Sequence, residues 1–146
     1  MIVVVDTNIL FSACLTPQGR IFEILFNTPA YAQLISGHYA IEELSSHKDK
    51  LVHLSKRPTE KVDFLIAAIL KQIDFYYEET IESRHWHEAD RLTKEVDSKD
   101  ISFVALSLQT DALLWTGDKK LVTHLRAKGF DRVIDTSKLY ELFAIG

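Results

Sequence analysis

Short apolar runs, each bounded by polar or turn-forming residues, recur along this chain between longer segments. The first is Ile2–Val5, which is β-branched throughout and ends abruptly at the polar residues Asp6, Thr7 and Asn8. A run this short and this uniformly apolar is typical of a strand buried in a parallel sheet. Four later segments are also predicted to be strands: residues 33–36, 73–77, 112–115 and 132–135.

Segments with helical spacing of apolar residues separate these strands. Within residues 59–71, for example, Val62, Ile66 and Ile69 fall on one helical face. The other predicted helices are residues 9–15, 20–26, 38–54, 83–96, 101–108 and 119–128, and a last helix that is capped by Ser137 and ends at residue 143. Strands that alternate with helices predict an α/β fold, in which helical layers cover a mainly parallel sheet of about five strands.

Composition and length point to an ordinary globular domain. No internal repeat or linker divides the chain, so residues 1–146 are predicted to form a single domain. The longest apolar runs fall far short of the roughly 18 residues of a membrane span, and no signal-peptide pattern precedes the first strand. The only cysteine, Cys14, excludes an internal disulfide and a cysteine-based metal site. We therefore expect a cytoplasmic protein without a membrane partner.

Acidic residues stand where a parallel sheet usually binds its ligands. Asp6 and Asp118 each follow an apolar strand directly, and the carboxyl ends of parallel strands meet along one edge. Asp100 directly precedes an apolar helix, and Glu42 and Glu43 lie early in the helix after the second strand. Carboxylates from four distant segments are therefore expected near one edge of the sheet.

These acids also have purely structural interpretations. Asp6 and Asp118 suit the N-cap position of a helix, and Asp97 and Asp100 resemble a capping arrangement. Helix capping does not explain the cluster as a whole, because carboxylates that lie close together repel one another unless cations neutralise them. Oxygen ligands without cysteine suit Mg²⁺ or Mn²⁺. The net charge of −4 argues against a broadly basic nucleic-acid surface but is compatible with such a neutralised site.

Four sequence blocks surround these acids, and together they span essentially the whole chain. In order they are VVVDTNIL, ISGHYAIEEL, DSKDISFVALSL and LLWTGDKKL. The chain resembles the PIN-domain nucleases in these blocks. The resemblance implies a three-layer α/β/α sandwich, a four-acid site for Mg²⁺ or Mn²⁺, and hydrolysis of RNA phosphodiester bonds. It further implies an antitoxin partner, because many members are ribonuclease toxins of toxin–antitoxin pairs, and it leaves a homo-oligomer open.

The resemblance assigns the catalytic and metal-binding roles to particular acids. The first, third and fourth positions fall on Asp6, Asp100 and Asp118. For the second position, the family's acid is commonly followed by Leu or Ile, which favours Glu43 before Leu44, whereas counting from Ser36 favours Glu42; we choose Glu43. Four further residues are expected to support the site: Asn8, Thr116, Asp97 and Glu42.

Functions from other classes explain these residues less well. A haloacid-dehalogenase-type phosphotransferase normally has a second Asp two residues after the first, where this chain has Asn8. A receiver domain needs an Asp after a middle strand, and residues 77–79 offer none. A dinucleotide-binding domain needs a glycine-rich first turn. The alternative that stays open is a catalytically weak PIN-like domain that serves as an RNA-binding or assembly module.

Two expectations concern neighbouring segments. Four cations near the same edge of the sheet are candidates for phosphate contacts: Arg20, Lys99, Lys119 and Lys120. The aromatic residues 75–77 are expected to pack in the core of the sheet rather than to stack on bases.

Overall fold

A parallel sheet forms the centre of the computed structural model, which describes residues 1–96 and 100–145. The strands are β1 (Ile2–Val5), β2 (Gln33–Gly37), β3 (Asp74–Tyr76), β4 (Leu113–Trp115) and β5 (Val133–Ile134). Their order across the sheet is β3-β2-β1-β4-β5, and every neighbouring pair is parallel. The predicted α/β fold with five strands is therefore confirmed.

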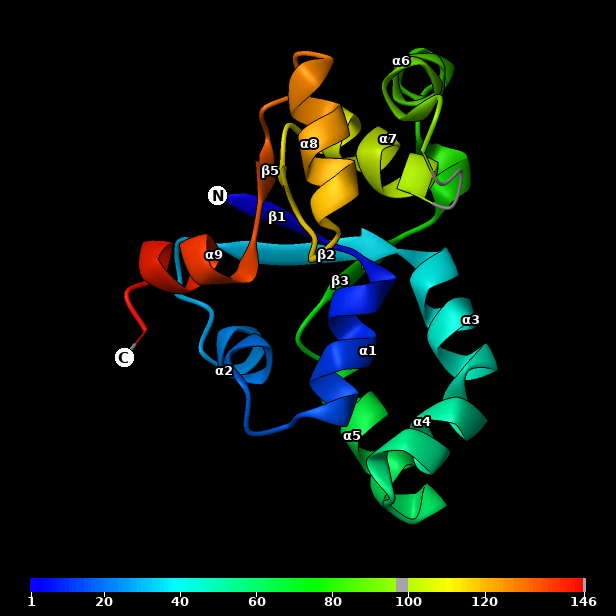
Figure 1. Cartoon of the computed structure of the whole chain (residues 1–146), viewed down its shortest axis with the longest axis vertical. Coiled ribbons are helices and arrows are strands. Elements are labelled where there is room, and N and C mark those ends of the chain that lie inside the picture. The colour runs from blue at the N-terminus through cyan, green and yellow to red at the C-terminus, as the bar shows by residue number, and fades with distance from the viewer. Residues whose placement is uncertain (97–99, 146) are drawn as a thin grey trace.

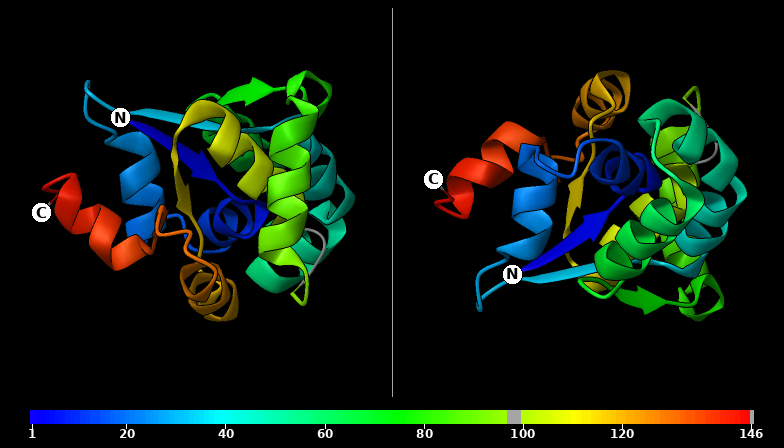
Figure 2. Two further views of the ribbon diagram at one scale, coloured as in Figure 1. Left: turned by 90° about the horizontal axis from the view of Figure 1, so that it is seen from above. Right: turned by 90° about the horizontal axis from the view of Figure 1, so that it is seen from below.

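Helices lie on both sides of this sheet, with α1, α2 and α5 on one side and α6 and α7 on the other (Figures 1 and 2). Their bounds are α1 (Thr7–Leu15), α2 (Arg20–Phe26), α3 (His38–Ser46), α4 (Lys48–Ser55), α5 (Thr59–Leu70), α6 (Ser83–Thr93), α7 (Ile101–Thr110), α8 (Lys119–Ala127) and α9 (Thr136–Leu142). A short 3₁₀ helix, η1 (Glu78–Thr80), follows β3. This arrangement confirms the three-layer α/β/α sandwich.

The central strands are uniformly apolar because both of their faces are covered. Val3, Val4 and Val5 of β1 are completely buried, as are Leu114 and Trp115 of β4. The apolar helix α7 packs on this part of the sheet and contacts β1, β2 and β4. A strand covered on both faces cannot alternate apolar with polar residues, so its first polar residue marks the point where the chain leaves the sheet.

Two helix predictions were wrong in detail. The segment predicted as one helix over residues 38–54 is broken at His47 into α3 and α4, which lets both helices pack against α1. The last helix is capped by Asp135 rather than Ser137, because an Asp135 carboxylate oxygen accepts a hydrogen bond from the Lys138 backbone N–H at 2.8 Å. Ser137 lies inside the first turn of α9.

The edge strand β3 departs from the expected aromatic core. Phe75 packs against the core as expected, whereas Tyr76 at the end of β3 and Tyr77 just beyond it are 38% and 60% exposed at the edge of the sheet. Glu78, which follows in η1, is buried, and its carboxylate accepts a hydrogen bond from the Tyr39 backbone N–H at 2.9 Å. This contact fixes the start of α3 against the end of β3.

Among the described residues, no single helix is long and apolar enough to cross a membrane. Helices α1 and α2 reach that length and composition only as a pair, and they are bent by 108° relative to each other. Helix α1 buries Ile9, Leu10, Ala13 and Cys14 in the core.

Candidate functional site

Asp6 is held in place at the carboxyl end of the central strand. It is the N-cap of α1, and its Oδ1 accepts a hydrogen bond from the Ile9 backbone N–H at 2.9 Å. Only 3% of the residue is exposed. The structural interpretation of Asp6 as a cap is therefore correct, and the cap fixes where its carboxylate lies.

Asp118 occupies the equivalent place on the neighbouring strand, β4. Its Oδ1 accepts a hydrogen bond from the Leu121 backbone N–H at 3.2 Å, so it caps α8. Its own backbone N–H donates to the Thr116 hydroxyl oxygen at 3.1 Å, and the Thr116 side chain is also hydrogen-bonded to the Asp6 carboxylate. Thr116 thus links the two acids directly.

Burial dominates the electrostatics of Asp6. Loss of hydration raises the pKa of its carboxyl from 3.8 to about 6, and the charge of Asp118 adds to this rise. Hydrogen bonds from Thr116 and from the backbone N–H groups of Ile9 and Asn8 oppose it. The net rise means that the protein around Asp6 stabilises its negative charge less well than water does.

Helix α3 brings one of its two neighbouring glutamates to Asp6. Glu43 is partly buried and lines the same cavity as Asp6 and Asp118, whereas Glu42 is exposed and does not line it. The helix orients them this way because Ala40 and Leu44 of α3 are completely buried and fix its rotation. Of the two residues considered for the second acidic position, the structure places Glu43 in the cavity.

Asp100 reaches the cavity from the other side of the sheet. It is the N-cap residue of α7 and lines the cavity together with Phe103 of the first turn. Asp97 and Lys99, named above as a supporting acid and a candidate phosphate contact, lie outside the described residues.

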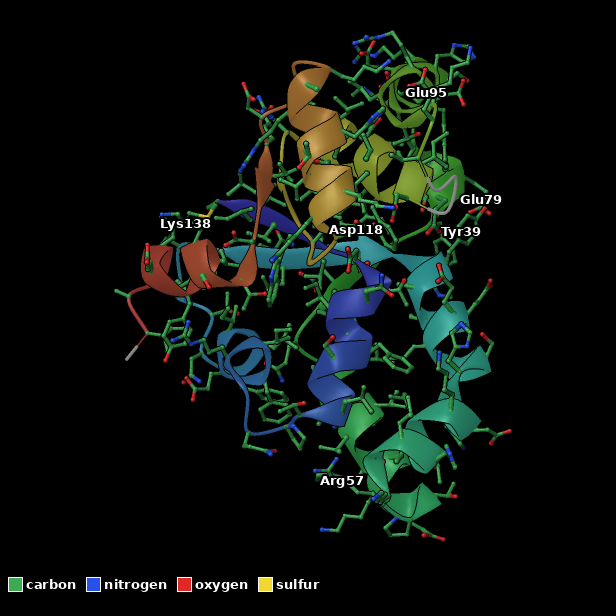
Figure 3. The ribbon with its side chains drawn as sticks, viewed as in Figure 1. Tyr39, Arg57, Glu79, Glu95, Asp118 and Lys138 are labelled. Atoms are coloured by element: carbon green, nitrogen blue, oxygen red, sulfur yellow. The ribbon has the colours of Figure 1, made fainter. Side chains whose placement is uncertain are left out.

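The resulting cavity has a volume of about 170 Å³. Its lining residues include all four acids chosen from the sequence, together with the supporting residue Asn8: Asp6, Asn8, Glu43, Asp100 and Asp118. Figure 3 labels Asp118 at the centre of the molecule, where α8 meets the sheet. Thr116 contacts Asp6 without lining the cavity.

Several other cavity residues were not singled out from the sequence. They are Thr7, Phe11, His47 and Phe103. The signal for His47 was present, because it lies four residues after Glu43 and therefore projects from the same face of a helix. Its ring meets the Phe11 ring edge to face, with 6.4 Å between the ring centroids.

The donor chemistry of the cavity fits a hard divalent cation. Its acidic side chains offer only oxygen atoms, and the buried Thr7 hydroxyl has no hydrogen-bond partner in the described part of the chain. Within residues 1–96 and 100–145, however, no three His, Cys, Asp or Glu side chains are close enough to enclose a metal ion. The fit to a divalent cation therefore rests on the chemistry of the oxygen donors alone, and Mg²⁺ commonly binds through one or two carboxylates while keeping several waters.

Comparison with known proteins agrees with this arrangement. Residues 4–135 match a family model described as "PIN domain", whereas no curated protein matches the sequence significantly. A structure described as VapBC2 from Rickettsia felis, bound to a DNA fragment from their promoter, aligns with a TM-score of 0.68 at 14% identity, covering 92% of this chain and 97% of the other.

Two further solved structures are similar to the same extent. PAE2754 from Pyrobaculum aerophilum gives a TM-score of 0.69 at 15% identity, covering 99% of this chain and 90% of the other. VapBC-1 from nontypeable Haemophilus influenzae gives a TM-score of 0.68 at 18% identity, covering 94% of this chain and 99% of the other. At these identities the structural matches establish the fold, and the family match covers most of the chain.

Proposed function

Because this chain belongs to the PIN-domain family of nucleases, we propose that it is a divalent-metal-dependent endoribonuclease that hydrolyses RNA phosphodiester bonds. The observation that carries the proposal is the meeting of four acids from distant segments in one cavity: Asp6, Glu43, Asp100 and Asp118. We assign these four residues to metal binding and catalysis. The active unit is a single domain spanning residues 1–146.

The residues of the chain perform three tasks in this reaction. The acids hold Mg²⁺ or Mn²⁺, and the caps of α1 and α8 keep Asp6 and Asp118 in fixed orientations. Thr116 ties the Asp6 carboxylate to the backbone N–H of Asp118. When bound, a divalent cation supplies positive charge to the phosphoryl oxygens and acidifies a water. The His47 imidazole lies at the same cavity, where its N–H can donate to a phosphate oxygen.

We further propose that the protein is the toxin of a toxin–antitoxin pair and acts on cytoplasmic RNA. Two of the similar structures are VapBC structures, one of them bound to a DNA fragment from their promoter, and this supports an antitoxin as partner. The alternative, a catalytically weak RNA-binding or assembly module, is less well supported, because all four acidic positions are filled and line one cavity.

The decisive experiment compares two neighbouring glutamates. Purified wild type should cleave a labelled single-stranded RNA with Mn²⁺ or Mg²⁺ and not with EDTA. Glu43→Gln and Asp6→Asn should lower kcat by about 100-fold, because mutation even of the outer-shell partners of metal ligands typically costs about 10- to 100-fold. Glu42→Gln, the matched control on an exposed position, should keep its activity.

Metal binding can be measured without catalysis. Mn²⁺ should raise the Tm of the wild type and of Glu42→Gln, since a ligand that binds only the folded state stabilises it. The Tm of Asp6→Asn should respond much less. Metal-dependent cleavage that persists in Asp6→Asn, or a wild type that cleaves no RNA, would refute the proposed function. Equal losses in Glu42→Gln and Glu43→Gln would refute only the assignment of the second acid.

A further inference from the structure

Three adjoining clefts extend the acidic cavity on the other side of Asn8 and Asp118. These two residues line both the cavity and the first cleft, which continues to Ser12, Gly117 and Thr136. Because they share lining residues, the acidic cavity and this first cleft are neighbours that meet at Asn8 and Asp118.

The first cleft continues into two arms. One arm shares Ser12 and Thr136 with it and reaches Thr16 and Arg20, at the turn between α1 and α2. The other arm shares Gly117 with it and runs along α8. We name the three clefts together the α1/α8 groove. Figure 1 shows the elements around it, with α8 above α1 and with α2 and α9 on one side.

The charge of the arms is opposite to that of the cavity. Arg20 lines one arm, and Lys119 and Arg126 line the other, where Asp135 is the only acid among the lining residues. Within the described part of the chain, no ion pair is formed by any of these three cations. Lys119 and Arg126 are seven residues apart, two helical turns, and therefore share one face of α8.

The surroundings of Arg20 and Thr136 leave hydrogen-bond donors of both side chains able to bind a ligand. The Arg20 guanidinium lies over the Tyr140 ring, 5.0 Å from its centroid, and stacking of this kind leaves the N–H groups in the guanidinium plane free for an anion. The Thr136 hydroxyl accepts a hydrogen bond from the Trp115 indole N–H at 3.0 Å, so its own hydrogen can be donated to a ligand.

The size of the groove limits what it can hold. Its three clefts have volumes of about 320 to 340 Å³ each, the range of pockets for small ligands. Clefts of this size that follow one another can take successive nucleotides of one extended strand. Cations and hydroxyl donors are the groups with which proteins usually contact phosphates and sugars.

We propose that the α1/α8 groove binds single-stranded RNA across the acidic cavity, with Arg20 holding a phosphate on one side of the scissile bond and Lys119 and Arg126 holding phosphates on the other. The inference rests on the proposed function and adds the path of its substrate. The scissile phosphate lies at the junction, where Asn8 and Asp118 border both the cavity and the groove. Lys120 does not line the groove and is not part of the path.

The test measures RNA binding rather than cleavage. In an Asp6→Asn background, which keeps the groove residues intact, the Kd of a labelled single-stranded RNA is measured by fluorescence anisotropy at several salt concentrations. Each phosphate contact to a single strand contributes about 0.7 to the slope of log K against log salt. Arg20→Gln, Lys119→Gln and Arg126→Gln should therefore each lower the slope by about 0.7 and weaken binding by roughly three- to tenfold.

Two matched controls remove cations that do not line the groove. Lys128→Gln lies just beyond the end of α8, and Arg84→Gln lies on α6; both should leave the Kd and the slope unchanged. The proposal is overturned if the slope stays constant in Arg20→Gln and Lys119→Gln, or if the controls lower it equally. The binding titration tests the path of the RNA strand independently of cleavage. The proposed function is tested separately, by RNA cleavage in the wild type and its loss in Asp6→Asn.

Discussion

Replacing Asp6 with asparagine tests the electrostatics of the cavity in the absence of metal. Asparagine caps helices about as well as aspartate does, so the hydrogen bond from the Ile9 backbone N–H can be kept. The substitution removes only the negative charge. Because that charge is buried beside Asp118, the metal-free variant should be more stable than the wild type at neutral pH, even though it should be inactive.

The magnitude follows from the pKa of the buried carboxyl. Burial raises the pKa of Asp6 from 3.8 to about 6, so the folded protein holds a proton that the unfolded chain has already released. Each pKa unit corresponds to about 1.4 kcal/mol, so burying the ionised carboxylate lowers the free energy of unfolding by about 3 kcal/mol in full. By linkage, the wild type carries little of this penalty below pH 3.8 and all of it above about pH 6. Its free energy of unfolding therefore falls as the pH rises through this window.

Urea denaturation in EDTA at pH 4.5 and pH 7.5 measures the effect. Linkage predicts that the buried charge lowers the free energy of unfolding of the wild type by about 1 kcal/mol at pH 4.5 and by about 3 kcal/mol at pH 7.5. The stability gained by Asp6→Asn should therefore be about 2 kcal/mol larger at pH 7.5 than at pH 4.5. Asp135→Asn is the matched control, because Asp135 also caps a helix but is exposed. An advantage that stays constant or shrinks with rising pH would show that the carboxylate is better solvated than the structure implies.

Two further predictions concern the core beside the cavity. A Cβ at position 37 would lie 2.1 Å from a Glu78 carboxylate oxygen, so Gly37→Ala should lower the free energy of unfolding by about 1–3 kcal/mol. The loss should be smaller in a Glu78→Ala background, and equal losses would disprove the clash. Cys14 is 1% exposed and burial raises the pKa of its thiol to about 11, so a thiol reagent should modify it only as fast as the protein opens. Rapid labelling of the native protein at pH 8 would contradict this.

The elements around the site could be predicted because their sequence signals are local. A strand covered on both faces must be apolar throughout, and its first polar residue marks the end of the sheet. This reasoning located β1, β4 and the positions of Asp6 and Asp118. The choice of Glu43 over Glu42 rested on resemblance and stays a prediction; the structure adds that Glu43 lines the cavity and Glu42 does not, because the buried face of α3 sets the rotation of the helix.

Features that depend on tertiary contacts could not be predicted in this way. The pattern of residues 38–54 is helical throughout, and only packing on α1 shows that the axis turns at His47. Tyr76 and Tyr77 have the composition of a core strand, but strand order makes β3 an edge. Glu78 is buried beside the start of α3, where the Tyr39 backbone N–H donates a hydrogen bond to its carboxylate, and this contact is not visible in the local sequence.

The two interpretations of the acids, as helix caps and as site residues, are compatible: Asp6 and Asp118 cap helices through their side chains, whereas Asp100 occupies the N-cap position without a side-chain capping hydrogen bond. Asp6, Asp100 and Asp118 are the N-cap residues of α1, α7 and α8, and all three line the cavity. The N-terminus of a helix carries partial positive charge, so helices that begin at one cavity lower the repulsion among the acids gathered there. The pKa of Asp6 is nevertheless raised, chiefly because burial removes the hydration of its carboxylate, with a smaller contribution from the charge of Asp118. In the proposed function, a bound cation would neutralise the negative charge that the helix ends leave unbalanced.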